Sequence, residues 1–531
     1  MTPAEKENQE LKARLKKALE RNEELEEMVR QLQRMIFGKK TEKFETVVKG
    51  QGSLFDDEQL AALVDSDIDL TETEVTEIEV IEKKKVVRHR ERKNPQGRAA
   101  FLDSLPQVEE LTPLEDTQCP TCQHEMRKIG KRVNSREAEL IPPQLRCVNH
   151  CQETYKCLEC EKAGETVIKS SKTPQLLLPH SLVSGSILAE VANYKFNLAV
   201  PIHRQKKIWE RLGLPVNKSS LVRSVISVSE TYLEPLVNLM TKEIRKEPVV
   251  HMDETPIKVL DEPSQRGYLW VIRTTKEFSK YPIIQFNYRH GRKGKTVEEL
   301  VGDDYRGIIE CDDYVAYNED KHEQIKFGAC LVHIRRWFIN IIKDSRKILK
   351  KSLAIQIVKR IGKIFEIEQQ LEYETKEEKL KQRILRLKPA VDEFFEFLKQ
   401  VVHKTNSKLR THIESTLKLE PRVYRIFEDG QVPLSNNDIE QSIRFSTIIR
   451  KNSLFAQSVA GAKACAVYYS LVETAKENNL DVAEYFRYLF KYLPNRIDED
   501  LTAYLPWAKQ VQVACCQGRL KIVILWRFKN V

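Results

Sequence analysis

The segment from Pro248 to about residue 332 constrains the fold most, because short apolar runs alternate there with turn residues at the spacing of β-strands. These runs predict strands at 249–253, 268–274, 281–287, 307–311 and 326–332, with a short helix at 295–301. The residues on either side are patterned for helices instead. We therefore expect a multidomain α+β chain in which a sheet-containing domain is flanked by helical segments.

Three acidic residues stand where this pattern can bring them together. A ribonuclease-H-like sheet begins with three strands, a helix and a further strand, which is the order predicted here. Asp253 stands late in the first predicted strand and Asp312 at the end of the fourth. Their carboxylates face one point if these two strands are neighbours. Glu440 adds a third carboxylate from the start of a helix that resumes at Asp438. Three such oxygen ligands suit Mg²⁺ or Mn²⁺, and two ions about 4 Å apart clamp the attacking and leaving oxygens of a phosphodiester exchange.

Glu440 also has a purely structural explanation. With Asn437 as the N-cap residue it occupies the third helical position, where a glutamate closes a capping box. It also precedes Arg444 by four residues, a spacing that favours an ordinary helix salt bridge. The residues alone therefore leave the three-carboxylate site as one of two interpretations.

A cysteine cluster between residues 119 and 160 predicts a metal site. The polar N-terminus predicts no signal peptide, and in a cytosolic chain clustered cysteines favour metal over disulfides. Two CxxC pairs can place four thiolates around one structural Zn²⁺ and fold a small module: Cys119, Cys122, Cys157 and Cys160. The competing ligands are Cys147, Cys151, His124 and His150.

Residues 5–37 are patterned as a coiled coil. They contain no glycine or internal proline, and their apolar residues recur at alternating steps of three and four, with Asn22 at an a position that favours two strands. An amphipathic helix packed within its own domain is the alternative. The next stretch is acidic over 51–82 and basic over 83–98, which predicts a linker whose basic arm either touches phosphates or is a solvated tether.

Residues 181–245 are patterned as consecutive helices with a tight break at Gly213. Helix, short turn and helix is compatible with a DNA-reading helix-turn-helix, with Arg204, Lys206 and Lys207 as candidate contacts. A purely structural helical hairpin fits the pattern equally well.

The overall charge narrows the class of partner. The formal net charge is +10 and the pI about 8.8, which favours a polyanionic partner, nucleic acid before membrane. No apolar run approaches the roughly eighteen residues that a membrane span requires. We therefore expect a cytoplasmic, nucleic-acid-binding protein.

Taken together, the motifs resemble those of the large transposase of the insertion-sequence-66 family. The likeness follows the family's order from about residue 5 to Trp507. The motifs that carry it are Phe37-Gly-Lys-Lys-Thr-Glu-Lys43, the two CxxC pairs, His251-Met-Asp-Glu-Thr255, Tyr268-Leu-Trp270, Asp312-Asp-Tyr314, Cys330-Leu-Val-His333-Ile-Arg-Arg336, Asn436-Asn437 with Glu440, Arg450-Lys-Asn452 and Gly461-Ala462.

This resemblance implies a DDE transposase that binds its element's ends and a target DNA in the bacterial nucleoid. It places the catalytic triad, which holds two Mg²⁺ or Mn²⁺ ions, on Asp253, Asp312 and Glu440, and it implies a zinc-binding module. Water would nick the DNA and a 3′-hydroxyl would then attack the target. A homo-oligomer through the coiled coil and small accessory proteins of the same element are the implied protein partners.

Five cations around this site are candidates to contact DNA phosphates: Arg335, Arg336, Arg444, Arg450 and Lys451. The alternative for each of them is a solvated surface charge. The expected domains are a coiled coil (1–44), a charged linker (45–104), a zinc module (105–175), a helical DNA-binding segment (176–246), a ribonuclease-H-like core in two parts (247–337 and 433–495), a helical insertion between them (338–432) and a tail (496–531).

The chain departs from the family's usual pattern in three places. Asp313 stands where a glycine is usual, Gln441 stands where an arginine is common, and the end beyond Trp507 is unfamiliar. The extra charge of Asp313 either disturbs metal binding or points away. Two other functions therefore stay open: a catalytically inactive zinc-containing DNA-binding protein derived from a transposase, and a ribonuclease-H-like nuclease that stops at hydrolysis.

Overall fold

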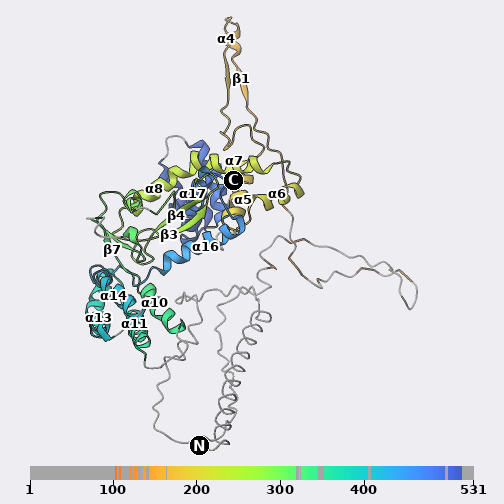
Figure 1. Ribbon diagram of the computed structural model, residues 1–531. Coiled ribbons are helices and arrows are strands. Elements are labelled where there is room, and N and C mark those ends of the chain that lie inside the picture. The colour runs from red at the N-terminus through yellow and green to blue at the C-terminus, as the bar shows by residue number, and fades with distance from the viewer. Residues whose placement is uncertain are drawn as a thin grey trace, which may run out of the picture. The chain divides into compact units, whose positions relative to one another are not determined.

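Figure 1 shows the computed structural model of the chain. It describes residues 143–516 except 163, 293, 318–321, 323, 345–351, 405–407 and 497–499, together with scattered residues between 102 and 138. The predicted coiled coil, the charged linker, Cys119, Cys122 and the chain beyond residue 516 lie outside the described residues.

The described part contains a five-stranded mixed sheet. Its strands are β3 (Val249–Lys258), β4 (Arg266–Thr274), β5 (Ile284–Arg289), β6 (Ile308–Glu310) and β7 (Lys326–Phe327). They lie in the order β5-β4-β3-β6-β7. The pairs β3–β4 and β4–β5 are antiparallel, whereas β6 runs parallel to both β3 and β7. This confirms the predicted run of three strands, a helix (α9, Lys295–Val301) and a further strand.

The last predicted strand, 326–332, is wrong over most of its length. β7 ends at Phe327, and helix α10 (Leu331–Asp344) begins four residues later. The apolar run misled the prediction because periodicity alone cannot distinguish a short buried strand from a buried helix. Helix α10 also spans residues 337 and 338, where the core was expected to give way to the insertion.

Except for one short turn between β6 and β7, the other described elements lie before and after this sheet in the chain. A two-stranded antiparallel hairpin precedes it, formed by β1 (Thr154–Lys156) and β2 (Ile168–Ser170). The other α-helices are α4 (Leu158–Lys162), α5 (Gly185–Phe196), α6 (Ile202–Arg211), α7 (Lys218–Val228), α8 (Glu234–Ile244), α11 (Leu353–Gln369), α12 (Lys376–Gln382), α13 (Lys388–Val401), α14 (Lys408–Lys418), α15 (Glu420–Val423), α16 (Asn437–Ser453), α17 (Val459–Glu477), α18 (Val482–Tyr492) and α19 (Lys509–Cys515). The π-helical turns are η1 (Ser229–Leu233) and η4 (Arg383–Leu387), and the 3₁₀ turns are η2 (Val315–Tyr317), η5 (Val402–Lys404), η6 (Tyr424–Phe427), η7 (Leu493–Asn495) and η8 (Leu501–Tyr504).

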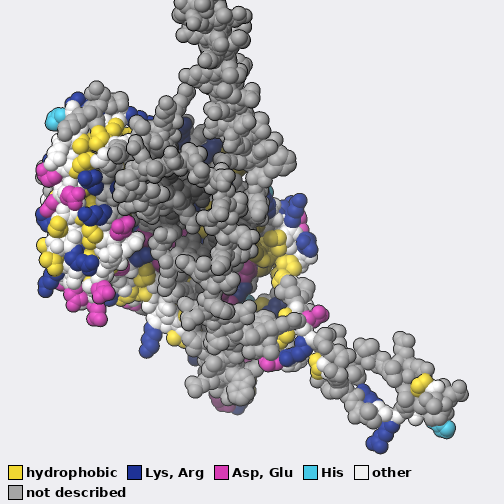
Figure 2. Space-filling view, turned by 90° about the horizontal axis from the view of Figure 1, so that it is seen from below, with side chains coloured by type: hydrophobic (Ala, Val, Ile, Leu, Met, Phe, Trp, Pro, Cys, Tyr) yellow, Lys and Arg dark blue, Asp and Glu magenta, His cyan; other side chains and the backbone are white. Residues whose placement is uncertain are grey.

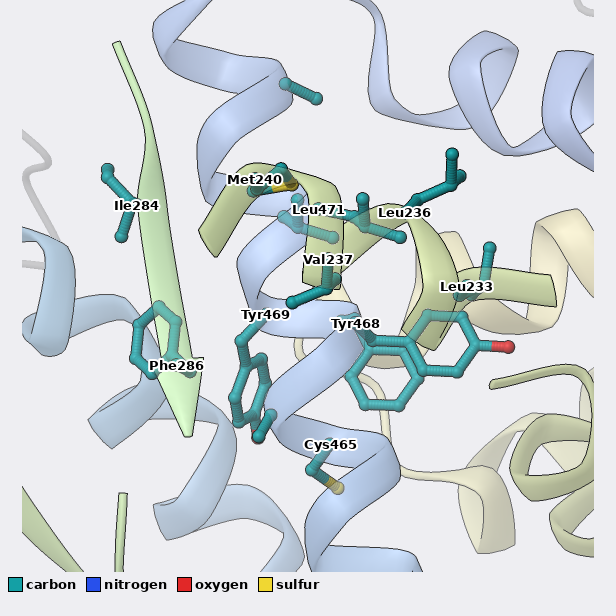
Figure 3. Packing of buried hydrophobic residues seen from close by; sticks show 14 of the residues in the cluster. Leu233, Leu236, Val237, Met240, Ile284, Phe286, Cys465, Tyr468, Tyr469 and Leu471 are labelled. Atoms are coloured by element: carbon teal, nitrogen blue, oxygen red, sulfur yellow. The ribbon is translucent and has the colours of Figure 1, made fainter. Parts of the chain in front are cut away.

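Helix α17 packs between the edge strand β5 and the helices that precede the sheet in sequence (Figure 3). Tyr469 lies against Phe286 of β5, with ring centroids 5.5 Å apart, and Tyr468 stacks on Phe196 of α5 at 4.3 Å. The apolar side chains of this helix therefore bury one edge of the sheet together with α5 and α8.

The same helix also satisfies backbone groups of β5. The Ser470 hydroxyl accepts the Phe286 N–H at 2.8 Å, and the Thr474 hydroxyl accepts the Ile284 N–H at 3.0 Å. An edge strand otherwise leaves such groups unpaired, so these bonds close the β5 edge without another strand.

The helices between α10 and α16 share a second apolar core. It joins Val249 of β3 and Ile308 of β6 to buried side chains of α10, α11, α13 and α14. The helical insertion therefore packs on the β3–β6 region of the sheet. No helix within the described ranges is long and apolar enough to cross a membrane.

Candidate active site

The first two predicted carboxylates lie on neighbouring parallel strands. β3 and β6 pair with His251 opposite Glu310. Asp253 lies two residues further along β3, in the middle of a strand that continues to Lys258 and not late in it as predicted, and Asp312 lies two residues past the end of β6. Their carboxylates are close enough to repel each other. The expectation that these two strands are neighbours is confirmed.

Asp253 and Asp312 are half-buried side chains in a negatively charged environment. Burial raises the pKa of Asp253 to about 8, and repulsion from Asp312, Glu254 and Glu440 adds to this rise. Burial also raises the pKa of Asp312 to about 6, with a contribution from Glu254 that nearby arginines oppose. Within the described residues, Oδ1 of Asp312 is buried without a hydrogen-bond partner. The pKa values of both aspartates stay raised in spite of the nearby arginines, and a divalent cation can supply the further positive charge that these carboxylates require.

Glu440 belongs to helix α16, whose beginning is fastened to β3 through Asn436. The Asn436 side chain donates to the Met252 carbonyl at 3.3 Å, and its Oδ1 lies 2.9 Å from Nδ1 of His251. Its backbone N–H donates to the Cys330 sulfur at 3.1 Å. Because these groups are buried, the start of α16 is fixed relative to the strand that carries the first aspartate.

Arg273 of β4 fastens the same helical turn from a second strand. Its side chain is 1% exposed, and Nη1 donates to the Asp438 carbonyl and to the Ser442 hydroxyl, each at 2.9 Å. The sequence analysis missed this role. An arginine inside the apolar run of a strand was the available signal, because a buried charge requires partners.

The Glu440 carboxylate is directed toward helix α10. Its Oε1 lies 3.2 Å from Nε2 of His333, and its Oε2 lies 3.8 Å from Nη2 of Arg336. The side chain is 28% exposed, so it keeps access to solvent, as the half-buried aspartates also do.

Both structural explanations for Glu440 are wrong. Helix α16 has Asn436 as its N-cap residue and no side-chain cap hydrogen bond, so Glu440 occupies the fourth position and closes no capping box. Arg444 is exposed and makes no ion pair with Glu440 in the described part of the chain. The Glu440 carboxylate therefore does not serve to stabilise its own helix.

The three carboxylates are neighbours whose side chains still have other partners. In the described ranges, no group of three or more His, Cys, Asp or Glu side chains is arranged to hold a metal ion. Asp253 accepts the N–H of Glu254 at 2.7 Å, and Glu440 is engaged by α10. A small hollow beside the site is lined by Asp312, Asp313, Ala329, Cys330, His333, Ile334, Trp337, Leu419 and Arg422.

Two arginines that the sequence analysis missed lie beside these acids. Arg292 forms an ion pair with Glu254, which also accepts the Tyr317 hydroxyl at 2.6 Å. Arg422 donates to the Asp312 backbone carbonyl at 3.3 Å. It is separated from Asp312 by 110 positions, so no local pattern reveals this contact.

The cations predicted to contact DNA occupy three helices. On α6, Arg204, Lys206 and Lys207 are exposed, opposite the buried Gln205 and Trp209. This arrangement is compatible with either a DNA-contacting helix or a structural one, and Lys206 also lies 3.2 Å from Glu210.

The predicted DNA-contacting cations on α10 and α16 differ in their exposure to solvent and in their contacts within the protein. Arg444 and Lys451 are exposed, whereas Arg335 and Arg336 are half-buried. Arg450 donates to the Thr255 hydroxyl at 2.8 Å and to the Pro256 carbonyl, so its guanidinium fastens α16 to β3. On the face shown in Figure 2, basic and acidic side chains of the described residues are interspersed.

Of the predicted zinc ligands, only the second pair lies in the described residues. Cys157 directly follows β1, and its N–H donates to the Val167 carbonyl at 2.9 Å, while Cys160 lies on the short helix α4. Cys119 and Cys122 lie outside the described residues, so the ligand set stays a prediction.

Comparison with known proteins places these elements in one family. The sequence model described as transposase IS66 family matches residues 180–464. Residues 24–109 match transposase C of IS166 homeodomain, residues 116–161 match the zinc-finger binding domain of transposase IS66, and residues 470–507 match the IS66 C-terminal element.

Curated relatives extend over most of the chain. Uncharacterized protein y4qI of Sinorhizobium fredii is 24% identical over 515 residues, which cover 94% of this chain and 91% of the relative. Uncharacterized protein y4hP of the same organism is 26% identical over 413 residues, covering 74% and 73%. The match over residues 180–464 alone spans more than half of the 531 residues, and the chain therefore belongs to the IS66 family of transposases.

Proposed function

We propose that this chain cuts and joins DNA through Asp253, Asp312 and Glu440, with two Mg²⁺ or Mn²⁺ ions held between them. The observation that carries the proposal is the placement of Asp253 within β3 and of Asp312 just past the end of the neighbouring parallel strand β6, with Asp312 and Glu440 near enough to raise the pKa of Asp253. Membership of the transposase family supports the same activity.

The strand order supports a ribonuclease-H-like core. Numbered along the chain within this sheet, the order is third, second, first, fourth and fifth, with the first three strands antiparallel and the last two parallel to the first. Helix α16 then returns to β3 after the helical insertion and contributes Glu440.

The residues fit divalent cations by their chemistry. Asp253 and Asp312 are half-buried acids with raised pKa values, and the buried Oδ1 of Asp312 has no hydrogen-bond partner in the described ranges. When bound, such cations neutralise phosphate charge and lower the pKa of an attacking water or hydroxyl. Glu440 would exchange its present contacts with His333 and Arg336 for this role.

The reaction requires two successive exchanges at phosphorus. First, a water oxygen bonds to phosphorus and the bond between phosphorus and the 3′ oxygen breaks. The water loses a proton and the leaving 3′ oxygen gains one, which gives a 3′-hydroxyl. That hydroxyl oxygen then bonds to a target phosphorus, and the 3′ oxygen of the target leaves with a proton. Arg444 and Lys451, exposed on the helix that carries Glu440, are placed to bind phosphates of the DNA.

Other parts of the chain would recognise the DNA and assemble the protein. We assign DNA contacts to the exposed cations of α6 and a structural Zn²⁺ to the paired CxxC module. The leucine-zipper segment supports a homo-oligomer. We also propose that transposition requires small accessory proteins of the same element.

Product analysis with labelled DNA that carries the ends of the element tests this function. With Mg²⁺, we expect nicking at the ends followed by covalent joining to a target duplex. Cleavage without joining would instead support the hydrolytic nuclease. Binding without metal-dependent cleavage would contradict the proposal and support the inactive DNA-binding relic.

The raised pKa of Asp253 predicts a stability that depends on pH and metal together. The pKa of Asp253 is about 8 in the folded protein, against an ordinary value of 3.8. Between these two pH values the unfolded chain has lost the proton that folded Asp253 keeps. Without metal, the stability that this proton contributes is therefore lost as the pH rises through this range. Mg²⁺ can replace the proton at pH 8, where the acid must ionise. We therefore expect Mg²⁺ to raise the thermal midpoint more at pH 8 than at pH 6.

Thermal unfolding of the wild type and Asp253→Asn at the two pH values, with and without Mg²⁺, checks this prediction. The difference between the two pH values should largely disappear in the variant. An equal Mg²⁺ effect at both pH values in the wild type would contradict it.

A further inference from the structure

Arg422 connects the helical insertion to the strand end that carries Asp312. It lies on α15, and its side chain is only 12% exposed. Nη2 donates to the Asp312 carbonyl at 3.3 Å and to the Cys311 sulfur at 3.1 Å. Nε and Nη2 also donate to the Gly328 carbonyl, at 3.0 and 2.7 Å. One guanidinium thus reaches the ends of both β6 and β7.

This contact lies where the sheet itself stops supporting the chain. β6 ends at Glu310, so Asp312 stands two residues beyond the last paired residue of its strand. Gly328 directly follows β7, and its N–H donates to the Ile309 carbonyl at 2.8 Å. Arg422 therefore bonds to the Asp312 backbone at the point where strand pairing no longer fixes it.

The neighbouring acid completes the arrangement. Oδ1 of Asp313 lies 3.7 Å from Nη1 of Arg422, and its side chain is 45% exposed. The acid that stands in place of the family's usual glycine thus faces a cation on the solvent side of the site. Leu419 and Val423, which flank Arg422 in the sequence, are buried in the core of the insertion.

We infer that Arg422 is a positioning residue that presents Asp312 for metal binding, and that the helical insertion supports the catalytic core through it. This inference rests on the proposed function. The planar guanidinium donates from several nitrogens in a fixed geometry, whereas a lysine ammonium at the same place is a single point charge. Arg422→Lys keeps the charge but not the simultaneous bonds to Asp312 and Gly328.

Metal dependence measured on the full-length chain tests the inference. The variants are Arg422→Lys and Arg422→Ala, with Arg410→Ala as the control, because Arg410 is an exposed arginine of the insertion that pairs only locally with Glu414. Two readouts are needed: the Mg²⁺ concentration that gives half-maximal single-turnover cleavage, and a Mn²⁺ titration followed by electron paramagnetic resonance. The relevant Mn²⁺ site is the one lost in Asp312→Asn.

We expect both Arg422 variants to raise the half-saturating metal concentration about tenfold or more, with a smaller change in the rate at saturating metal. Arg410→Ala should match the wild type. A purely structural role lowers the fraction of active protein but leaves the half-saturating concentration unchanged, and that result in Arg422→Lys overturns the inference even if Arg422→Ala fails to fold. If the wild type binds Mn²⁺ but cleaves no DNA, the proposed function fails, while the Mn²⁺ titration still decides the role of Arg422.

Discussion

Asp253→Asn is expected to lower metal-dependent cleavage by about three orders of magnitude or more, while binding of the DNA ends is retained. Asparagine has nearly the same shape and can still accept the Glu254 N–H that Asp253 accepts at 2.7 Å. It lacks the negative charge that holds a divalent cation beside Asp312. The loss should therefore appear in the chemical step and not in folding or DNA affinity.

The same substitution has an opposite expected effect on stability. Burial and three neighbouring acids raise the pKa of Asp253 to about 8, so the ionised side chain is unfavourable in the metal-free fold. A neutral asparagine removes this repulsion, and the thermal midpoint at pH 8 without metal should rise.

Single-turnover cleavage, end binding and thermal unfolding of the same preparations separate these effects. Asp303→Asn is the matched control, because it removes one acid from an exposed position after α9. It should cleave as the wild type does. Full cleavage by Asp253→Asn would remove this residue from the catalytic account.

Arg383→Met is expected to cause the largest loss of stability. Arg383 is fully buried in η4 and donates to Glu368 and to the carbonyls of Ile426, Gly430 and Val432, the last at 2.8 Å. Methionine fills part of the space but leaves these acceptors without their donor. Removing one partner from a buried charged network typically costs about 3–5 kcal/mol.

Arg386→Met provides the control within the same helical turn. Arg386 is exposed, and among the described residues it donates only to the Gln370 carbonyl, at 3.1 Å. Its substitution should change the free energy of unfolding by no more than about 0.5 kcal/mol. Urea unfolding of both variants checks the difference, and equal midpoints would show that the Arg383 network does not hold the insertion together.

The spacing of apolar residues predicted those helices and strands whose sequence has one clear period. The helix at Lys295–Val301 has the predicted bounds, because it has a clear apolar period and well-defined ends. The first strand begins at Val249 as predicted but continues to Lys258, five residues beyond its predicted end. The stretch after Phe327 was not predicted correctly, since its apolar run suits a strand or a buried helix equally. The end of the chain and the coiled coil lie outside the described residues and stay predictions.

The candidate site shows the same division. Asp253 and Asp312 could be paired from the sequence because each was predicted near a strand end, and the parallel pairing of β3 and β6 confirms that their strands are neighbours, although β3 continues five residues beyond Asp253. The contacts that hold Glu440 and Asp312 in place come from Arg273 and Arg422, which are distant in sequence from the groups they bind. Such contacts depend on tertiary packing, so no residue spacing reveals them.

Anomalous X-ray scattering from Mn²⁺ bound to the protein with cleaved element-end DNA is the decisive test of the proposed triad. We expect two Mn²⁺ peaks about 4 Å apart, ligated by carboxylate oxygens of Asp253, Asp312 and Glu440 and by phosphate oxygens of the DNA. Mn²⁺ bound elsewhere on the chain, with these three carboxylates remaining apart beside the DNA, would show that the triad does not hold the metal.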